Sequence, residues 1–190
     1  MPKFVIEGQH TLKGEISVSG SKNATLPILA ACLMTEKPVV LTNVPDISDV
    51  HAFLEILRGL NVKAEFKKGR VEVDAKNAKL NEIDVNLAKR MRASILLLGP
   101  MLARFKSARL AFPGGCVLGK RSIGAHLHAL TTLGAEIVES STEINLRAKK
   151  LRGRKILMME SSVTATENAI MAAVAAEGVT EIRWAAMEPH

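Results

Sequence analysis

The sequence predicts a fold of the α/β (α+β) class, in which a β-α-β-α-β-β unit is repeated and its helices pack inside against mixed sheets. The composition points to it first, because 47% of the residues are hydrophobic while the aromatic side chains are limited to five Phe and one Trp. A core of small and aliphatic side chains is typical of helices packed closely on sheets. Two further observations are that strand-like and helix-like segments alternate, and that their order recurs along the chain.

The first copy of the unit follows two short alternating segments. Residues 4–7 and 14–19 alternate apolar and polar side chains, so we expect two strands joined by a turn. Residues 20–33 run from a polar start into small and apolar side chains. This pattern favours a helix that is capped by Ser21 or Asn23.

A strand, a second helix and a hairpin complete the first copy. Residues 38–45 form a short apolar run that is typical of a buried strand. Residues 47–60 carry apolar side chains at helical spacing, and Asp46 or Ser48 can cap this helix. Residues 62–73 alternate around a central Lys-Lys-Gly, which indicates a hairpin.

The same order of elements recurs in two later stretches of the chain. The second copy is expected to hold a helix over residues 91–103, a strand over 108–112, a helix over 123–133 and a hairpin over 136–146. A third copy is expected to begin with a strand over 156–159, a helix over 166–176 and a strand over 180–184.

The spacing of equivalent residues supports the repeat. Fifteen positions separate Leu60 from Ala75, and the same number separates Leu133 from Ala148. Asn23, Arg92 and Asn168 are expected to be equivalent, since each precedes a proline (Pro45, Pro113 and Pro189) by 22, 21 and 21 positions. The repeats are therefore placed at 20–75, 76–148 and 149–190. Because the third lacks a second helix and a hairpin, we expect the chain to stop in mid-domain.

The charge and the cysteines limit the classes of partner and compartment. A net charge of +7 attracts anions of any kind, including nucleotides, phosphates and nucleic acid. Cys32 lies in an apolar run and is expected to be a buried thiol, and neither it nor Cys116 has metal-ligand spacing. The N-terminus has neither a signal-peptide pattern nor a spanning segment, so we expect a cytoplasmic protein with no membrane association.

A glycine-rich loop at residues 112–122 is the strongest candidate for chemistry. Pro113 to Leu133 spans 20 positions where Pro45 to Leu60 spans 15, so the second copy carries five extra residues here. Glycines allow the backbone to approach a ligand closely. Cys116 lies near Lys120 and Arg121, whose positive charges suit an anionic substrate and lower a thiol pKa. An inert thiol and solvated loop charges are the alternative interpretation.

Two other groups of residues stand near expected helix starts. Lys22 and Asn23 place a cation and an amide beside free backbone N–H groups, which suits a phosphate or carboxylate, although a solvated lysine and a capping asparagine fit equally. Arg92 begins an otherwise apolar helix and can bind substrate or form a structural ion pair. His126 and His128 diverge on a helix and cannot form a metal pair; His126 is expected near the site and His128 at the surface.

Four spaced motifs resemble the UDP-N-acetylglucosamine 1-carboxyvinyltransferase (enolpyruvyl transferase) family. They are Gly-Ser-Lys-Asn-Ala at 20–24, Met-Arg-Ala-Ser-Ile at 91–95 with Gly99 and Pro100, Pro-Gly-Gly-Cys at 113–116 with Gly119 and Arg121, and Ser162 to Asn168. Together they cover nearly all of the chain in the family's order. The resemblance implies an inside-out α/β barrel, with a second domain of the same repeat to which residues 1–19 would belong.

The resemblance also implies a reaction and its substrates. The enolpyruvyl group of phosphoenolpyruvate would be transferred to the 3′-hydroxyl of UDP-N-acetylglucosamine with release of phosphate, in the synthesis of peptidoglycan precursors. It implies no metal and no redox cofactor. Some residues of the site would come from the second domain, so we expect residues 1–190 alone to be inactive.

The family's roles fall on residues that this chain retains. Cys116 would be the proton donor and could bond covalently to phosphoenolpyruvate. Lys22 and Arg121 would bind phosphoenolpyruvate. Asn23 would hold the reacting hydroxyl or the adduct. The uridine side would be formed by residues 121–125 (Arg121, Ser122, Ile123, Gly124 and Ala125) together with Ser162 and Val163.

The chain departs from the family at positions on the nucleotide side. The family most often has Pro and Asp where this chain has Ser122 and Gly124, and often Lys and Gly where it has Glu160 and Thr164. Three alternatives therefore stay open. They are an enolpyruvyl transferase with another acceptor, such as shikimate-3-phosphate, a non-catalytic paralogue, and a basic nucleic-acid-binding module whose binding falls steeply with salt.

Overall fold

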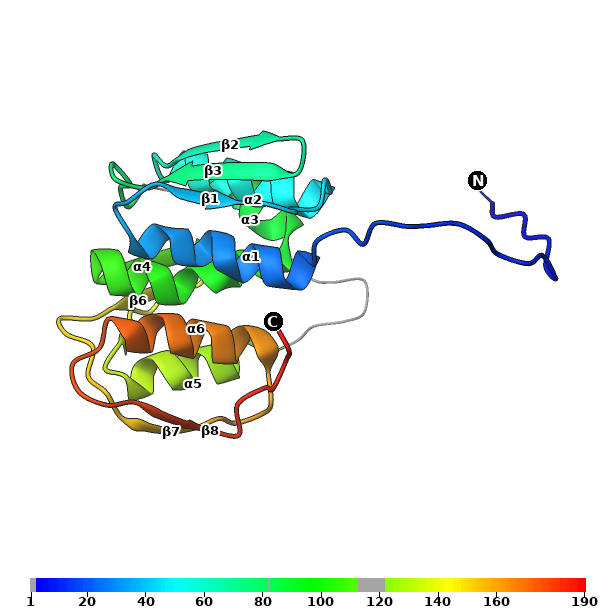
Figure 1. Cartoon of the computed structure of the whole chain (residues 1–190). Coiled ribbons are helices and arrows are strands. Elements are labelled where there is room, and N and C mark those ends of the chain that lie inside the picture. The colour runs from blue at the N-terminus through cyan, green and yellow to red at the C-terminus, as the bar shows by residue number, and fades with distance from the viewer. Residues whose placement is uncertain (1–2, 82, 113–121) are drawn as a thin grey trace.

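In the computed structural model, helices lie between separate small sheets (Figure 1), and residues 3–81, 83–112 and 122–190 are described. The first repeat begins with helix α1 (Lys22–Ala31), the 3₁₀ helix η1 (Cys32–Met34) and strand β1 (Val39–Leu41). It continues with helix α2 (Ser48–Gly59) and strands β2 (Lys63–Lys67) and β3 (Arg70–Asp74). The strands form an antiparallel sheet in the order β1-β3-β2. The predicted helix, strand, helix and hairpin of this copy are confirmed.

The second repeat has the same order with one additional helix. Helix α3 (Val85–Arg90) precedes the 3₁₀ helix η2 (Arg92–Leu97), helix α4 (Leu98–Phe105) and strand β4 (Ser107–Ala111). Helix α5 (Gly124–Thr132) and strands β5 (Glu136–Ile137) and β6 (Glu143–Arg147) follow. The strands again form an antiparallel sheet, in the order β4-β6-β5. Helix α3 was not expected from the sequence.

The third repeat has strand β7 (Lys155–Leu157), helix α6 (Val163–Val174) and strand β8 (Glu181–Arg183). Strands β7 and β8 pair in parallel, as the ends of a β-α-β unit do when a helix connects them. The three elements that the sequence predicts for this copy are confirmed.

The ends of α2 and α5 show the repeat in atomic detail. The N–H of Val62 donates to the carbonyl of Leu57, and the N–H of Ala135 donates to that of Leu130, both at 3.1 Å. The residue between helix and strand has a positive φ in each case, 60° at Asn61 and 105° at Gly134. These equivalences confirm the spacing from Leu60 and Leu133.

The starts of α1 and α6 correct the other expected equivalence. The Ser21 side chain accepts from the Ala24 N–H, and the Ser162 side chain accepts from the Ala165 N–H. Both serines are N-caps, so Asn168 corresponds to Pro27 and the expected match of Asn168 with Asn23 is wrong. Distances to later prolines misled the comparison because the loops between helix and proline differ in length.

The stretch predicted as one helix over residues 91–103 is interrupted between η2 and α4. The N–H of Gly99 donates to Asn168 Oδ1 at 2.7 Å, and the Ile95 carbonyl accepts from Asn168 Nδ2 at 2.9 Å. Pro100 has no N–H to donate. The buried amide of α6 therefore supplies hydrogen bonds at the junction where the helix type changes. A Cβ on Gly99 would lie 2.5 Å from the Asn168 carbonyl oxygen, so the two helices meet closely there.

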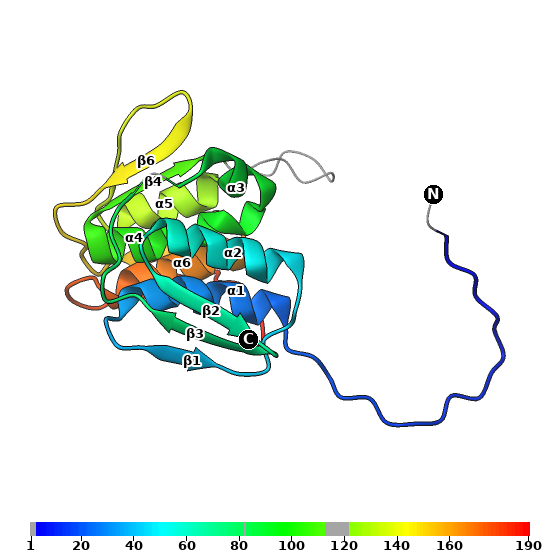
Figure 2. The same ribbon diagram turned by 90° about the horizontal axis from the view of Figure 1, so that it is seen from above.

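The two strands predicted over residues 4–7 and 14–19 are absent from the described structure. Residues 3–20 contain no helix or strand, and Figures 1 and 2 show them extending away from the helices and sheets. Their apolar side chains lie in solvent, with Phe4 96% exposed. A strand needs a neighbouring strand for its backbone hydrogen bonds, and the described residues supply none here.

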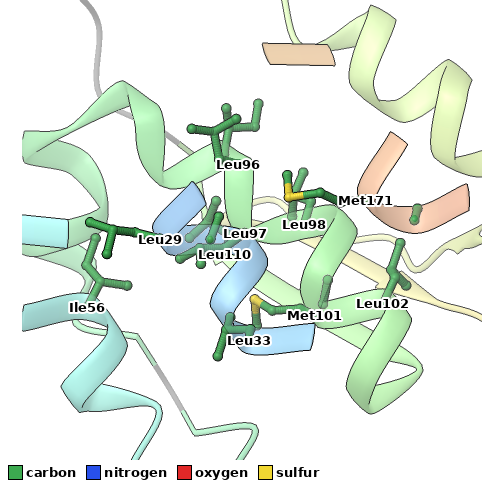
Figure 3. Packing of buried hydrophobic residues seen from close by; sticks show 14 of the residues in the cluster. Leu29, Leu33, Ile56, Leu96, Leu97, Leu98, Met101, Leu102, Leu110 and Met171 are labelled. Carbon is green, nitrogen blue, oxygen red and sulfur yellow. The ribbon is translucent and has the colours of Figure 1, made fainter. Parts of the chain in front are cut away.

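The core is aliphatic and lies between the helices, as the composition predicts. Leu29 of α1, Ile56 of α2 and Met101 of α4 are fully buried, and Figure 3 shows them within one cluster with side chains of neighbouring elements. The predicted burial of Cys32 is confirmed, and burial raises the pKa of its thiol to about 11. The cap of α2 differs from the prediction: Ile47 occupies that position, and Asp46 instead contacts His51 at 2.6 Å.

Candidate functional site

The first turns of α1, η2 and α6 meet around a cavity of about 210 Å³. Lys22 and Asn23 reach it from α1, Ala93 and Leu96 from η2, and Val163 and Thr164 from α6. Unpaired backbone N–H groups and the helix dipole make each helix start favourable for an anion. The repeat therefore brings several such starts to one place, although they are far apart in sequence.

Lys22 and Asn23 take up the positions that the sequence predicts. Lys22 lies in the first turn of α1, where its charge is unfavourable to the helix dipole, and its ammonium group forms an ion pair with Asp49 in the first turn of α2. Asn23 is exposed and is not the cap, because Ser21 has that role. The alternative interpretation of Asn23 as a capping residue is therefore wrong.

Arg92 connects the start of η2 to the start of α5. Its Nη2 donates to the Ser122 carbonyl at 3.4 Å, and its side chain is half-buried. The Ser122 side chain in turn accepts from the Gly124 N–H at 2.9 Å, within the turn that enters α5. Arg92 thus lies beside the segment that the sequence assigns to the uridine side, together with Ile123 and the buried Ala125.

His126 and Thr164 join the first turn of α5 to the first turn of α6. His126 Nε2 and Thr164 Oγ1 lie 2.9 Å apart in a hydrogen bond, and His126 is only 1% exposed. Burial, and then the positive charge of Arg92, lower the pKa of His126 to about 4, so this ring is neutral at physiological pH. The sequence placed His126 near the site but gave no signal for its partner, which is 38 positions away. His128 is half-buried, and its Nε2 donates to the Leu157 carbonyl at 3.0 Å in an exposed hydrogen bond, which agrees with the surface position expected for it.

Ser162 and Val163 begin α6, three residues before the predicted helix start at residue 166. Ser162 caps the helix, and its carbonyl also accepts a hydrogen bond from the Thr166 hydroxyl at 2.8 Å. Val163 lines the cavity with Lys22 and Asn23. Glu160, two residues before the cap, is exposed.

The C-terminal segment 186–190 contacts the first turns of α6, and its Glu188 and His190 line the same cavity, which the sequence did not indicate. The Ala186 N–H donates to Thr166 Oγ1 at 3.0 Å, and His190 lies 3.6 Å from Glu167. Burial raises the pKa of Glu167, although His190 partly opposes this change. The residues that line the cavity therefore include both charges, with Lys22 as a cation and Glu167 and Glu188 as carboxyl groups.

Cys116 and Arg121 lie at positions 113–121, outside the described residues, so their expected roles stay predictions. Of the other predicted residues, Lys22, Asn23 and Val163 share the cavity, whereas Arg92 and Ser122 contact one another. Within residues 3–81, 83–112 and 122–190, no three His, Cys, Asp or Glu side chains are grouped as a metal site would need. No helix in this part of the chain is long and apolar enough to cross a membrane.

Comparisons with known proteins agree on one family. The family model described as EPSP synthase (3-phosphoshikimate 1-carboxyvinyltransferase) matches residues 6–190. The chain is 49% identical over 192 aligned positions to UDP-N-acetylglucosamine 1-carboxyvinyltransferase 1 of Carboxydothermus hydrogenoformans, covering 100% of this chain and 45% of the relative. It is 46% identical to the UDP-N-acetylglucosamine 1-carboxyvinyltransferase of Bradyrhizobium diazoefficiens, covering 99% and 44%. The chain thus spans less than half the length of these relatives.

Solved structures support the fold. The enolpyruvyl transferase NikO from Streptomyces tendae superposes with a TM-score of 0.79 at 22% identity, over 94% of this chain and 42% of that one. An EPSP synthase from Acinetobacter baumannii gives a TM-score of 0.73 at 21% identity, over 93% and 40%. These likenesses confirm the predicted arrangement of repeated units.

Proposed function

Because this chain belongs to the family described as EPSP synthase (3-phosphoshikimate 1-carboxyvinyltransferase), we propose that its protein transfers the enolpyruvyl group of phosphoenolpyruvate to UDP-N-acetylglucosamine. The 3′-hydroxyl is the acceptor and phosphate is released, in the synthesis of peptidoglycan precursors in the cytoplasm. The observation that carries the proposal is the identity of 46–49% to relatives of that name along the whole chain. A second domain, with which residues 1–19 belong, completes the site.

The donor side of the proposed site is the start of α1. Lys22 offers an ammonium group and Asn23 an amide beside the unpaired N–H groups of the first turn, which suits a phosphate or carboxylate. The ion pair with Asp49 holds the lysine in place and leaves two of its three N–H bonds for the donor. Arg121 clamps the phosphate in this proposal, because its planar guanidinium can contact two oxygens at once.

Cys116 is the general acid of the proposed reaction. Its proton goes to the terminal vinyl carbon while the 3′-oxygen bonds to the neighbouring carbon and gives up its own proton to a carboxylate of the second domain, which gives a tetrahedral adduct and a Cys116 thiolate. Phosphate then leaves that carbon with its bonding electrons and takes up the proton held by the carboxylate, while a proton from the new methyl group returns to the thiolate and the double bond is restored. Replacement by Asp preserves a proton donor, whereas replacement by Ala removes it, so we expect turnover in Cys116→Asp and none in Cys116→Ala.

The acceptor side is formed by the starts of α5 and α6. Ser122, Ile123, Gly124 and Ala125 lead into α5, and Ser162 and Val163 into α6, so that backbone N–H groups are available to the diphosphate of the nucleotide. Arg92 supplies a positive charge beside the first of these turns. The exposed carboxylate of Glu160 has the wrong sign for a diphosphate, but it points to solvent rather than into a buried site.

The experiment that tests the proposal is phosphate release from phosphoenolpyruvate, with and without UDP-N-acetylglucosamine. The chain is extended past His190 with the part of the relatives that it does not cover, and residues 1–190 alone serve as the comparison. We expect release only in the extended protein and only with the UDP-sugar. Release with shikimate-3-phosphate instead would assign the other acceptor, and no release from a folded protein with either acceptor would overturn the proposal. Full turnover by Cys116→Ala would remove the role of Cys116.

A further inference from the structure

A polar network that is buried at His126 and Asn168 and half-buried at Thr164 ties together the helix starts on the acceptor side. Thr164 is fixed at two of its atoms: Oγ1 bonds His126 Nε2 at 2.9 Å, and its carbonyl accepts from Asn168 Nδ2 at 3.2 Å. Asn168 also contacts Ile95 and Gly99 at the junction of η2 and α4. His126 and Asn168 are both at least 99% buried. The network therefore connects α5 to α6 through His126 and α6 to η2 through Asn168, and both of these side chains are buried.

The bond between His126 and Thr164 is the part of this network that joins α5 to α6. His126 is two residues past Gly124 in the first turn of α5, and Thr164 follows Val163 in the first turn of α6. A change in the length of this bond moves one turn relative to the other. Ligand binding that depends on both turns is sensitive to such a shift, because misplacement by about 1 Å costs much of a site's affinity or rate.

His126 and Thr164 form a hydrogen bond between two neutral side chains, not an ion pair. Burial and the nearby Arg92 lower the pKa of His126 and keep the ring neutral, and its Nδ1 has no hydrogen-bond partner among residues 3–81, 83–112 and 122–190. The bond to Thr164 is thus the hydrogen bond by which this ring is held in the described structure. Buried hydrogen bonds are costly to break when the remaining partner has no access to water.

We propose that His126 and Thr164 are a positioning pair that fixes the spacing of the two acceptor-binding turns and thereby sets the KM for the nucleotide sugar. The inference rests on the proposed function for the identity of the ligand. The geometric part, a hydrogen bond that restrains both turns, stands on the structure alone. Neither side chain is assigned a contact with the reacting atoms.

The test compares three threonine variants in the extended protein. Thr164→Val keeps the shape of the side chain and removes the hydroxyl, Thr164→Ser keeps the hydroxyl, and Thr131→Val is the matched control. Thr131 lies in α5, is half-buried, and donates to the Leu127 carbonyl at 2.8 Å, outside the network. Thr164→Val leaves the buried His126 Nε2 without its partner, so we expect it to raise the KM for UDP-N-acetylglucosamine by about tenfold and to change the KM for phosphoenolpyruvate less than about twofold. Thr164→Ser restores the acceptor KM, and Thr131→Val leaves it unchanged.

Amide hydrogen exchange separates this inference from the proposed function. In residues 1–190, Thr164→Val is expected to speed exchange in the first turns of both α5 and α6, whereas Thr131→Val does not. An unchanged acceptor KM, an equal rise in both KM values, or no rescue by serine would overturn the positioning role. If wild-type protein does not use the UDP-sugar, the proposed function fails, and the pair is judged by exchange alone, with unchanged exchange in either turn overturning it.

Discussion

Helices α1 and α6 begin in the same way and then differ in chemistry. Each has a serine cap, Ser21 or Ser162, whose carbonyl accepts a hydrogen bond of 2.8 Å from a threonine hydroxyl one turn later. The next two residues are Lys22 and Asn23 in α1 but Val163 and Thr164 in α6. In the proposed function, the repeat supplies one frame for binding an anion, and we infer that the residues after the cap decide which group it binds.

The first turns of α1 and α6 also differ in their exposure to solvent and in their charge. The first turn of α1 is exposed and carries a lysine that an aspartate holds, which suits a small, highly charged donor. The first turn of α6 is half-buried, uncharged and fixed by His126, which suits recognition through backbone groups. We infer a division of work between donor and acceptor, and the predictions that follow test it in order of expected effect.

The largest effect is expected where α6 meets α4. Gly99→Ala places a Cβ 2.5 Å from the Asn168 carbonyl oxygen, so backbone must move and the buried bonds of Asn168 are disturbed. We expect the free energy of unfolding to fall by about 3 kcal/mol in urea denaturation.

Gly59→Ala is the matched control, because Gly59 lies in α2 with nothing within 4 Å of an added Cβ. Alanine there is expected to leave stability equal or to raise it by up to about 1 kcal/mol. Equal losses in both variants would show that the close approach of α4 and α6 has no special weight.

The next prediction concerns how the free energy of unfolding depends on pH through His126, which joins α5 to α6. The pKa of His126 is lowered from 6.5 to about 4 in the folded protein, so the unfolded chain binds more protons between these values. Stability from this group is complete above pH 6.5 and is lost as the pH falls toward 4, by about 3 kcal/mol in total.

The measurement is the free energy of unfolding at pH 7 and pH 4.5 in the wild type and in His126→Gln. The variant removes the titrating ring, so the difference between the two proteins isolates its contribution from that of groups such as Glu167. A loss at low pH that is the same in both proteins would contradict the burial of a neutral His126.

Lys22→Ala tests the donor side. Loss of a charge-assisted hydrogen bond of about 1.5–3 kcal/mol predicts a rise of about 10- to 100-fold in the KM for phosphoenolpyruvate. Lys150 is a close control, since its side chain is 49% exposed, as that of Lys22 is, and forms an ion pair with Glu177. Lys150→Ala is expected to leave both KM values unchanged, and a similar rise in that variant would assign the effect to net charge.

The caps themselves are expected to have the smallest effects. Ser21→Ala and Ser162→Ala each remove one side-chain acceptor from a helix start, which costs about 1 kcal/mol of the free energy of unfolding. Thermal unfolding of the two variants is the measurement. Similar losses would support the equivalence of the two starts, and losses that differ by more than about 1 kcal/mol would contradict it.

Much of the fold follows from local pattern, but the junctions do not. Apolar spacing and the Ser21 position predict α1, α2, α5 and their following strands, because those signals lie within a few residues of the element. The break at Gly99 depends on Asn168, which is 69 positions away in sequence, and no local pattern reports that contact. Residues 4–7 and 14–19 alternate apolar and polar side chains as strands do. This alternation predicts which side chains share a face, but it does not show which strand would pair with them.

The candidate site shows the same limit. Lys22 and Asn23 could be placed at a helix start from the local pattern, because a capping serine precedes an apolar run. Ser162 and Val163 came only from the resemblance to the family, since the local pattern predicted a helix that begins at residue 166 and not at Val163. The partner of His126 could not be predicted, since a buried histidine and a threonine carry no signal for each other across 38 positions.

The crossed KM values of Lys22→Ala and Thr164→Val test the division of work most directly. Both variants, in the extended protein, are assayed for phosphate release against each substrate in turn. We predict that Lys22→Ala raises the KM for phosphoenolpyruvate and Thr164→Val that for UDP-N-acetylglucosamine, each with less than about a twofold change in the other. If both variants raise the KM for the same substrate, the starts of α1 and α6 do not serve different ligands and the account is contradicted.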